Sequence, residues 1–70
     1  MSTNQKYSAR IHSRRQLASV DTYVSSCVKQ LNSIGERYTE ALPQVSEACL
    51  NMISMLELIK AVIIKVRESI

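Results

Sequence analysis

The chain has few residues of the types that catalysis or metal binding requires, and their spacing does not bring them together. His12 is the only histidine, and no acid or activated nucleophile is placed beside it. Cys27 and Cys49 lie 22 positions apart, with no C-x-x-C pair, so they do not form a zinc-binding set. Gly35 is the only glycine, which excludes a glycine-rich phosphate loop. We therefore expect a protein that is not an enzyme and has no catalytic, cofactor-binding or metal-binding residues.

The cysteines and the apolar segments bear on where the protein works. Two cysteines are too few for a secreted disulfide scaffold, and both lie within apolar rows, so we expect reduced core residues. The first ten residues, MSTNQKYSAR, lack the apolar run of a secretory signal. The longest apolar stretch, residues 56–66, is interrupted by three charges and is shorter than the roughly 20 residues of a membrane span. These features predict a soluble protein of a cytoplasmic, reducing compartment.

Charge is segregated along the sequence. Residues 1–20 carry four basic residues and no acid, whereas residues 21–59 have a net charge of −3. We predict a flexible basic N-terminal arm over residues 1–12. The predicted basic contact residues are Arg10 and, just after the arm, Arg14 and Arg15, which are either solvated or in contact with an acidic protein. DNA-reading basic regions are denser than this one, so nucleic acid is the less favoured partner.

The first element that would position these residues is a long helix. Ser13 is a candidate N-cap, and Gln16 three residues later completes a possible capping box. Apolar residues then recur at intervals of three and four, which is the spacing of one helix face and of a coiled coil. This row contains Leu17, Val20, Val24, Cys27, Leu31, Ile34, Tyr38 and Ala41.

A second helix follows Pro43, with apolar residues over much of its circumference. One row contains Val45, Ala48, Met52, Met55, Ile59, Val62 and Val66, and its neighbour contains Cys49, Leu56, Ile63 and Ile70. A stripe this wide is typical of a helix that contacts several others. Residues 58–66 could also lie on a membrane surface, but they continue the heptad rows, so a protein core is the favoured environment.

The fold class is all-α, since the chain has one glycine, one proline and no tryptophan or phenylalanine. Pro43 lacks a backbone N–H and costs about 3 kcal/mol inside a helix. A break there leaves two segments of similar length, 14–41 and 44–69, and predicts an antiparallel helical hairpin spanning residues 13–70. A break near Gly35 is one alternative. A single long kinked coiled-coil helix is the other, because the heptad rhythm continues past the proline in phase.

In the hairpin, the antiparallel chain would bring like charges together. Arg10, Arg14 and Arg15 would lie at the same end as Lys60, Lys65 and Arg67, while Glu36, Glu40 and Glu47 would gather near the turn. Such a rod would be basic at its open end and acidic at its turn. Copies could associate head to tail, or the basic end could dock on an acidic surface.

A chain of 70 residues with so wide an apolar stripe should need a partner, because two helices that touch along one seam cannot cover it. We therefore predict a protein–protein interaction subunit, structural or chaperone-like, that completes a helical bundle or coiled coil with a helical protein. A self-assembling homo-oligomeric scaffold and a basic-arm binder of nucleic acid or membrane surface are the alternatives. The predicted partner interface consists of Leu17, Val24, Leu31, Met52, Leu56, Ile59, Ile63 and Val66.

In length and heptad periodicity, the chain resembles the short helical-hairpin subunits of several multi-protein complexes. Examples are the small needle chaperones of bacterial type III secretion and the small adaptor subunits of eukaryotic complexes. The resemblance implies a two-helix fold and a role in binding other helices.

Overall fold

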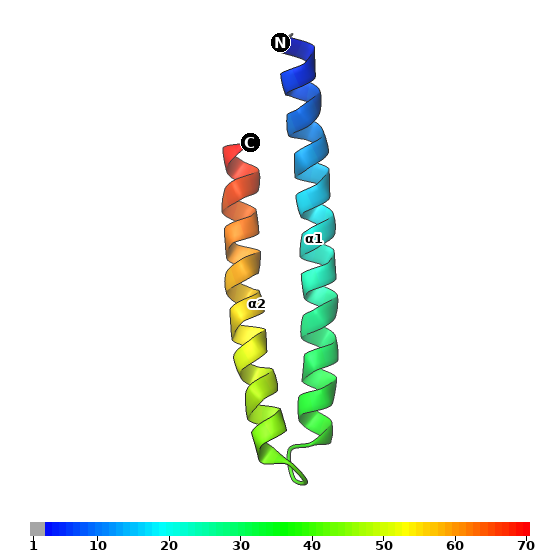
Figure 1. Ribbon diagram of the computed structural model, residues 1–70, viewed down its shortest axis with the longest axis vertical. Coiled ribbons are helices and arrows are strands. Elements are labelled where there is room, and N and C mark those ends of the chain that lie inside the picture. The colour runs from blue at the N-terminus through cyan, green and yellow to red at the C-terminus, as the bar shows by residue number, and fades with distance from the viewer. Residues whose placement is uncertain (1–2) are drawn as a thin grey trace.

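The protein is an antiparallel hairpin of two long helices, seen in a computed structural model that describes the backbone of residues 3–70 and the side chains from residue 8 onward. Helix α1 spans Thr3–Arg37 and helix α2 spans Pro43–Ser69. They lie side by side in a rod of 59 × 15 × 14 Å (Figure 1). The predicted all-α class and the break near Pro43 are confirmed. The alternatives are wrong, since Gly35 lies inside α1 and the chain does turn back on itself.

Helix α1 begins eleven residues before residue 14, where the sequence pattern predicted its start. Its first residue is Thr3, so Ser13 lies inside the helix and is not its N-cap. The predicted arm, residues 1–12, is therefore helical from Thr3 onward, and its first two residues lie outside the described backbone. The physical reason is that Gln, Lys, Ala and Arg favour helix, and neither glycine nor proline occurs before Gly35. The flexibility of this segment stays a prediction.

The turn over residues 38–42 satisfies backbone groups at the end of α1 without a left-handed residue. The backbone N–H of Tyr38 donates to the Ile34 carbonyl at 3.2 Å, and that of Leu42 donates to the Tyr38 carbonyl at 2.9 Å. The Thr39 hydroxyl donates to the Gly35 carbonyl at 2.9 Å, which serves another of the carbonyls left open at a helix C-terminus. Pro43 then begins α2 at a position where a missing N–H costs nothing.

The seam between the helices is narrow and only partly apolar. Among the described side chains, the buried apolar ones are Val24, Cys49 and Ile63. The helices approach closely near the turn, where a Cβ on Gly35 would lie 3.4 Å from the Cβ of Cys49, an ordinary contact distance. Leu17, Leu31 and Leu56 are half-buried along the same seam. A hairpin of this size therefore encloses very little core.

Polar side chains share the rest of the seam with apolar ones. Half-buried residues recur at intervals of seven on both helices; they are Asp21 and Val28 of α1, and Ser46, Ile53, Lys60 and Arg67 of α2. The Oδ1 atom of Asp21 is buried and has no hydrogen-bond partner. An unsatisfied buried oxygen costs roughly 1–3 kcal/mol, so this seam is less favourable than an apolar one.

Candidate helix-binding surface

One long side of the hairpin presents apolar side chains from both helices, and we call it the apolar face. The side chains on it are exposed or half-buried. It consists of Val20, Cys27 and Ile34 of α1, and of Met52, Met55, Ile59, Val62 and Val66 of α2. The spacing is seven residues on α1 and alternately three and four on α2, so each set keeps to one side of its helix. The apolar face is therefore a continuous strip that follows both helices.

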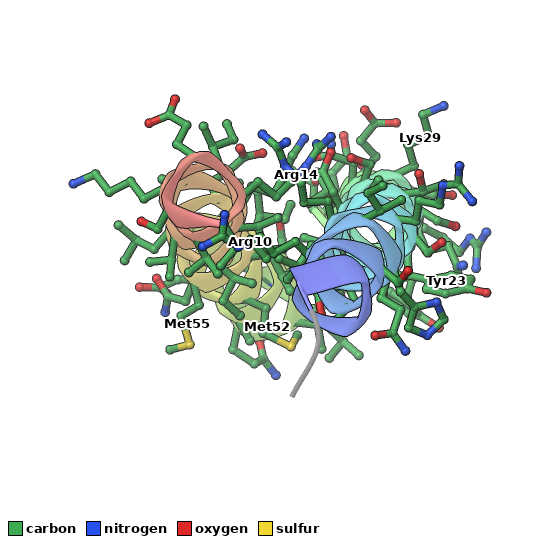
Figure 2. The ribbon with its side chains drawn as sticks, turned by 90° about the horizontal axis from the view of Figure 1, so that it is seen from above. Arg10, Arg14, Tyr23, Lys29, Met52 and Met55 are labelled. Carbon is green, nitrogen blue, oxygen red and sulfur yellow. The ribbon has the colours of Figure 1, made fainter. Side chains whose placement is uncertain are left out.

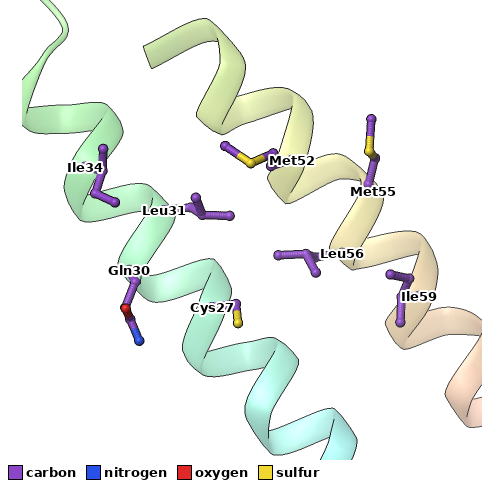
Figure 3. A pocket seen from close by; sticks show the side chains of 8 residues that line it. All are labelled: Cys27, Gln30, Leu31, Ile34, Met52, Met55, Leu56 and Ile59. Carbon is purple, nitrogen blue, oxygen red and sulfur yellow. The ribbon is translucent and has the colours of Figure 1, made fainter. Parts of the chain in front are cut away.

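A groove of about 450 Å³ opens on the half of the apolar face nearer the turn. Leu31 and Leu56 point toward each other between the helices in this groove (Figure 3). The groove is lined by Cys27, Gln30, Leu31, Ile34, Met52, Met55, Leu56 and Ile59. Gln30 is the one lining residue with a strongly polar side chain, so the groove suits an apolar ligand or side chain.

A second groove, of about 320 Å³, continues the first toward the open end of the hairpin. Ile59 lines both grooves, so together they form one channel along the molecule. The second groove is lined by Leu17, Leu58, Ile59, Val62, Ile63 and Val66. All six are aliphatic, and a channel of this kind between two helices is the form that receives the side chains of a further helix.

The opposite side, which we call the polar face, has a different character. In the view along the rod, Arg14 and Lys29 lie on one side and Met52 and Met55 on the other (Figure 2). The polar face consists of Arg14, Lys29, Asn32 and Glu36 of α1, and of Leu50, Ile64 and Glu68 of α2. Two apolar side chains among charges do not form a patch, because isolated exposed apolar residues are common on any protein.

The structure divides the predicted partner interface between two places. Val24 and Ile63 are buried in the seam, and Leu17, Leu31 and Leu56 are half-buried there. The other three, Met52, Ile59 and Val66, are exposed on the apolar face. Each helix thus uses one set of heptad positions for its own partner in the hairpin and leaves the neighbouring set open.

Part of the apolar face was not predicted from the sequence, and one cysteine lies elsewhere than predicted. Val20, Met55 and Val62 belong to the predicted rows but were not assigned to the interface. Cys27, predicted to be a core residue, is exposed on the apolar face, whereas Cys49 is buried with 3% of its surface exposed, as predicted. The exposed side chains could have been predicted from the two neighbouring apolar rows over residues 45–66, because a two-helix hairpin can bury only one of these rows.

The predicted distribution of charge is present in the folded hairpin. The antiparallel chain brings exposed Arg10, Arg14 and Arg15 to the open end of the hairpin. Lys60, Lys65 and Arg67, in the last third of α2, lie toward the same end, while exposed Glu36, Glu40 and Glu47 lie at the turn. The rod is therefore basic at one end and acidic at the other.

The described residues offer no arrangement typical of a metal centre. In that part of the chain no three His, Cys, Asp or Glu side chains come close enough to hold an ion. His12 is exposed on α1, and both cysteines are free thiols. Neither α1 nor α2 has the length and apolar character of a helix that crosses a membrane.

Comparison with known proteins gave no relative: no family model, curated protein or solved structure matches the chain.

Proposed function

We propose that this protein is a non-enzymatic interaction subunit that packs its apolar face against helices of another chain. The observation that carries the proposal is the apolar channel along one side of the hairpin, set against the three buried apolar side chains inside it. More apolar side chains are exposed on that side than are buried between the helices. Such a distribution is typical of a chain whose core is completed only in an assembly.

The arrangement of the apolar face favours a helical partner over a small molecule. Its residues recur with heptad spacing along α2 from Met52 to Val66, which corresponds to about 21 Å of helix at 1.5 Å per residue. A helix of the partner could lie along the channel, with its apolar side chains between those of α1 and α2. A small ligand would need an enclosed cavity that buries most of its surface, and both grooves of this channel are open to the surface.

Two isoleucines of α2 provide a matched test. Ile59 lies on the apolar face with 46% of its surface exposed, and Ile64 lies on the polar face with 54% exposed. We expect Ile59→Glu to abolish assembly, measured as molar mass by light scattering after size exclusion, because a carboxylate would be buried in the interface. Ile64→Glu should assemble like the unaltered chain.

Circular dichroism on the same fractions separates assembly from folding. Neither Ile59→Glu nor Ile64→Glu changes a side chain that is buried in the seam. The helix content of Ile64→Glu should therefore match that of the unaltered chain. Assembly of Ile59→Glu as complete as that of Ile64→Glu and of the unaltered chain, or a cooperatively folded monomer of the unaltered chain at all concentrations, would contradict the proposed function.

We also propose a cytoplasmic, reducing location. Cys27 is a free thiol exposed on the surface that we assign to binding, and an oxidising compartment would favour its coupling to other thiols. A Cys27 disulfide in protein isolated with its thiols blocked at lysis would contradict this location.

A further inference from the structure

We infer that the partner of the apolar face is a second copy of this chain, packed antiparallel about a twofold axis to form a four-helix bundle. The inference rests on the proposed function and adds the identity and direction of the partner. Three features of the hairpin support it: the symmetry of its apolar rows, the position of their centres and the distribution of charge.

The apolar rows have nearly the same spacing in both directions from a central residue. On α1, Val20 and Ile34 each lie seven positions from Cys27. On α2, Met52 and Val66 each lie seven positions from Ile59. A twofold axis across the rod pairs each helix with its own copy running in the opposite direction, and it requires rows that read alike from both ends.

The two centres lie near one another along the hairpin. Cys27 and Ile59 line one and the same groove, although they come from different helices. One axis can therefore pass near both of them. It would place Cys27 beside its copy, Ile59 beside its copy, and Val20 of one chain beside Ile34 of the other.

Charge selects the antiparallel direction over the parallel one. Arg10, Arg14 and Arg15 lie 12 to 17 positions before Cys27 on α1, about 18–26 Å from the axis toward the open end, and Glu36, Glu40 and Glu47 lie at the turn on the other side of the axis. Antiparallel packing brings the basic end of one chain to the acidic end of the other, whereas parallel packing places the basic open ends together. Like charges at one level disfavour the parallel dimer.

The orientation can be measured with a spin label near the turn. Gln44 is exposed, uncharged and 15 positions before Ile59, so a ketone-bearing amino acid at position 44, coupled to an aminooxy nitroxide, gives one label in each chain and leaves Cys27 and Cys49 in place. In the antiparallel dimer, double electron–electron resonance should give a label separation of about 45 Å. A parallel pair would keep the labels within about 30 Å, the combined width of two rods that are each 15 Å wide. The expected mass of the labelled chain, and of the unaltered chain as its control, is that of a dimer.

A charge exchange tests the same direction independently. Reversing the charge of the open end (Arg10→Glu, Arg14→Glu and Arg15→Glu together) or of the turn (Glu36→Arg, Glu40→Arg and Glu47→Arg together) should weaken the dimer about tenfold at low salt, because each exchange places like charges at both ends of the bundle; a double variant carries both exchanges. The double variant restores opposite charges and should recover most of the affinity, measured by sedimentation equilibrium. Failure of the double variant to recover would count against the antiparallel direction.

The remaining outcomes separate the inference from the proposed function. A dimer with the short label distance, an assembly larger than a dimer, or a poorly helical unaltered chain that does not self-associate would overturn the second copy as the antiparallel partner. Each of these leaves a helix-binding role intact. The proposed function itself fails only if the unaltered chain assembles and Ile59→Glu assembles as well as Ile64→Glu, or if the unaltered chain is a stably folded monomer.

Discussion

Ile59 and Ile64 belong to the same helix, are similarly exposed, and have very different neighbours. Ile59 lies among apolar side chains from both helices, in the channel of the apolar face. Ile64 lies beside Arg14, Arg67 and Glu68 on the polar face. What distinguishes the two faces is the continuity of apolar surface across both helices, because a partner gains from excluding water over a whole strip.

A third environment, the seam, lies between these faces and differs from both. It holds the buried apolar side chains and also the half-buried polar ones. If the seam stabilises the hairpin and the apolar face stabilises the assembly, the effects of substitutions in the two places should depend differently on protein concentration.

Ile63→Ala should lower the free energy of unfolding by about 3 kcal/mol, because it removes one of the few buried side chains and leaves a cavity. Val62→Ala, at an adjacent position with 58% of the side chain exposed, should change the stability of the isolated hairpin by less than about 1 kcal/mol. Thermal unfolding followed by circular dichroism at several protein concentrations would compare them.

The concentration dependence is the informative part of that comparison. Ile63→Ala should lower the melting temperature at every concentration. Val62→Ala should lower it only where the chain is associated, since the side chain is buried there by the partner. Equal loss for the two variants at low concentration would show that the seam and the apolar face do not have separate roles.

Much of the fold could be predicted from the sequence, because its determinants are local. Pro43 ends one helix pattern and begins another at a point that divides the chain into segments able to pair, and the hairpin follows. The start of α1 could not be found in the same way. Ser13 and Gln16 have the form of a capping box, but the residues before them are also good helix formers. Helix propensity does not decide whether the helix begins at Ser13 or continues upstream.

The side of each helix that faces the seam could not be read from hydrophobicity alone. On α2, the row through Met52 and Ile59 is as apolar as the row through Leu56 and Ile63, yet only the second lies between the helices. The seam is completed by positions that are polar, including Asp21, Lys60 and Ser46. A row containing such residues is not expected in a core, and the close approach at Gly35 depends on tertiary geometry.

Asp21→Leu should raise the free energy of unfolding by about 1–2 kcal/mol, the second-largest effect. The substitution removes a buried carboxylate oxygen that has no hydrogen-bond partner and adds apolar surface to the seam. Thr22→Leu is the control, since Thr22 is exposed at the next position and gains similarly in helix propensity. Chemical denaturation of both variants is the measurement, and equal gains would mean that propensity alone explains the effect.

The smallest effect concerns the closest approach of the two helices, where the seam is tightest. Gly35→Ala should stabilise the hairpin by about 0.5–1 kcal/mol, because alanine is the better helix former and its Cβ would lie 3.4 Å from the Cβ of Cys49 and 3.8 Å from the Oγ of Ser46. Gly35→Leu should destabilise it, since a larger side chain has no room there without separating the helices. If chemical denaturation shows that the two substitutions change the free energy of unfolding in opposite directions, this end of the seam is packed as closely as in the structure. Stabilisation by both substitutions would instead mean that the helices can separate near the turn at little cost.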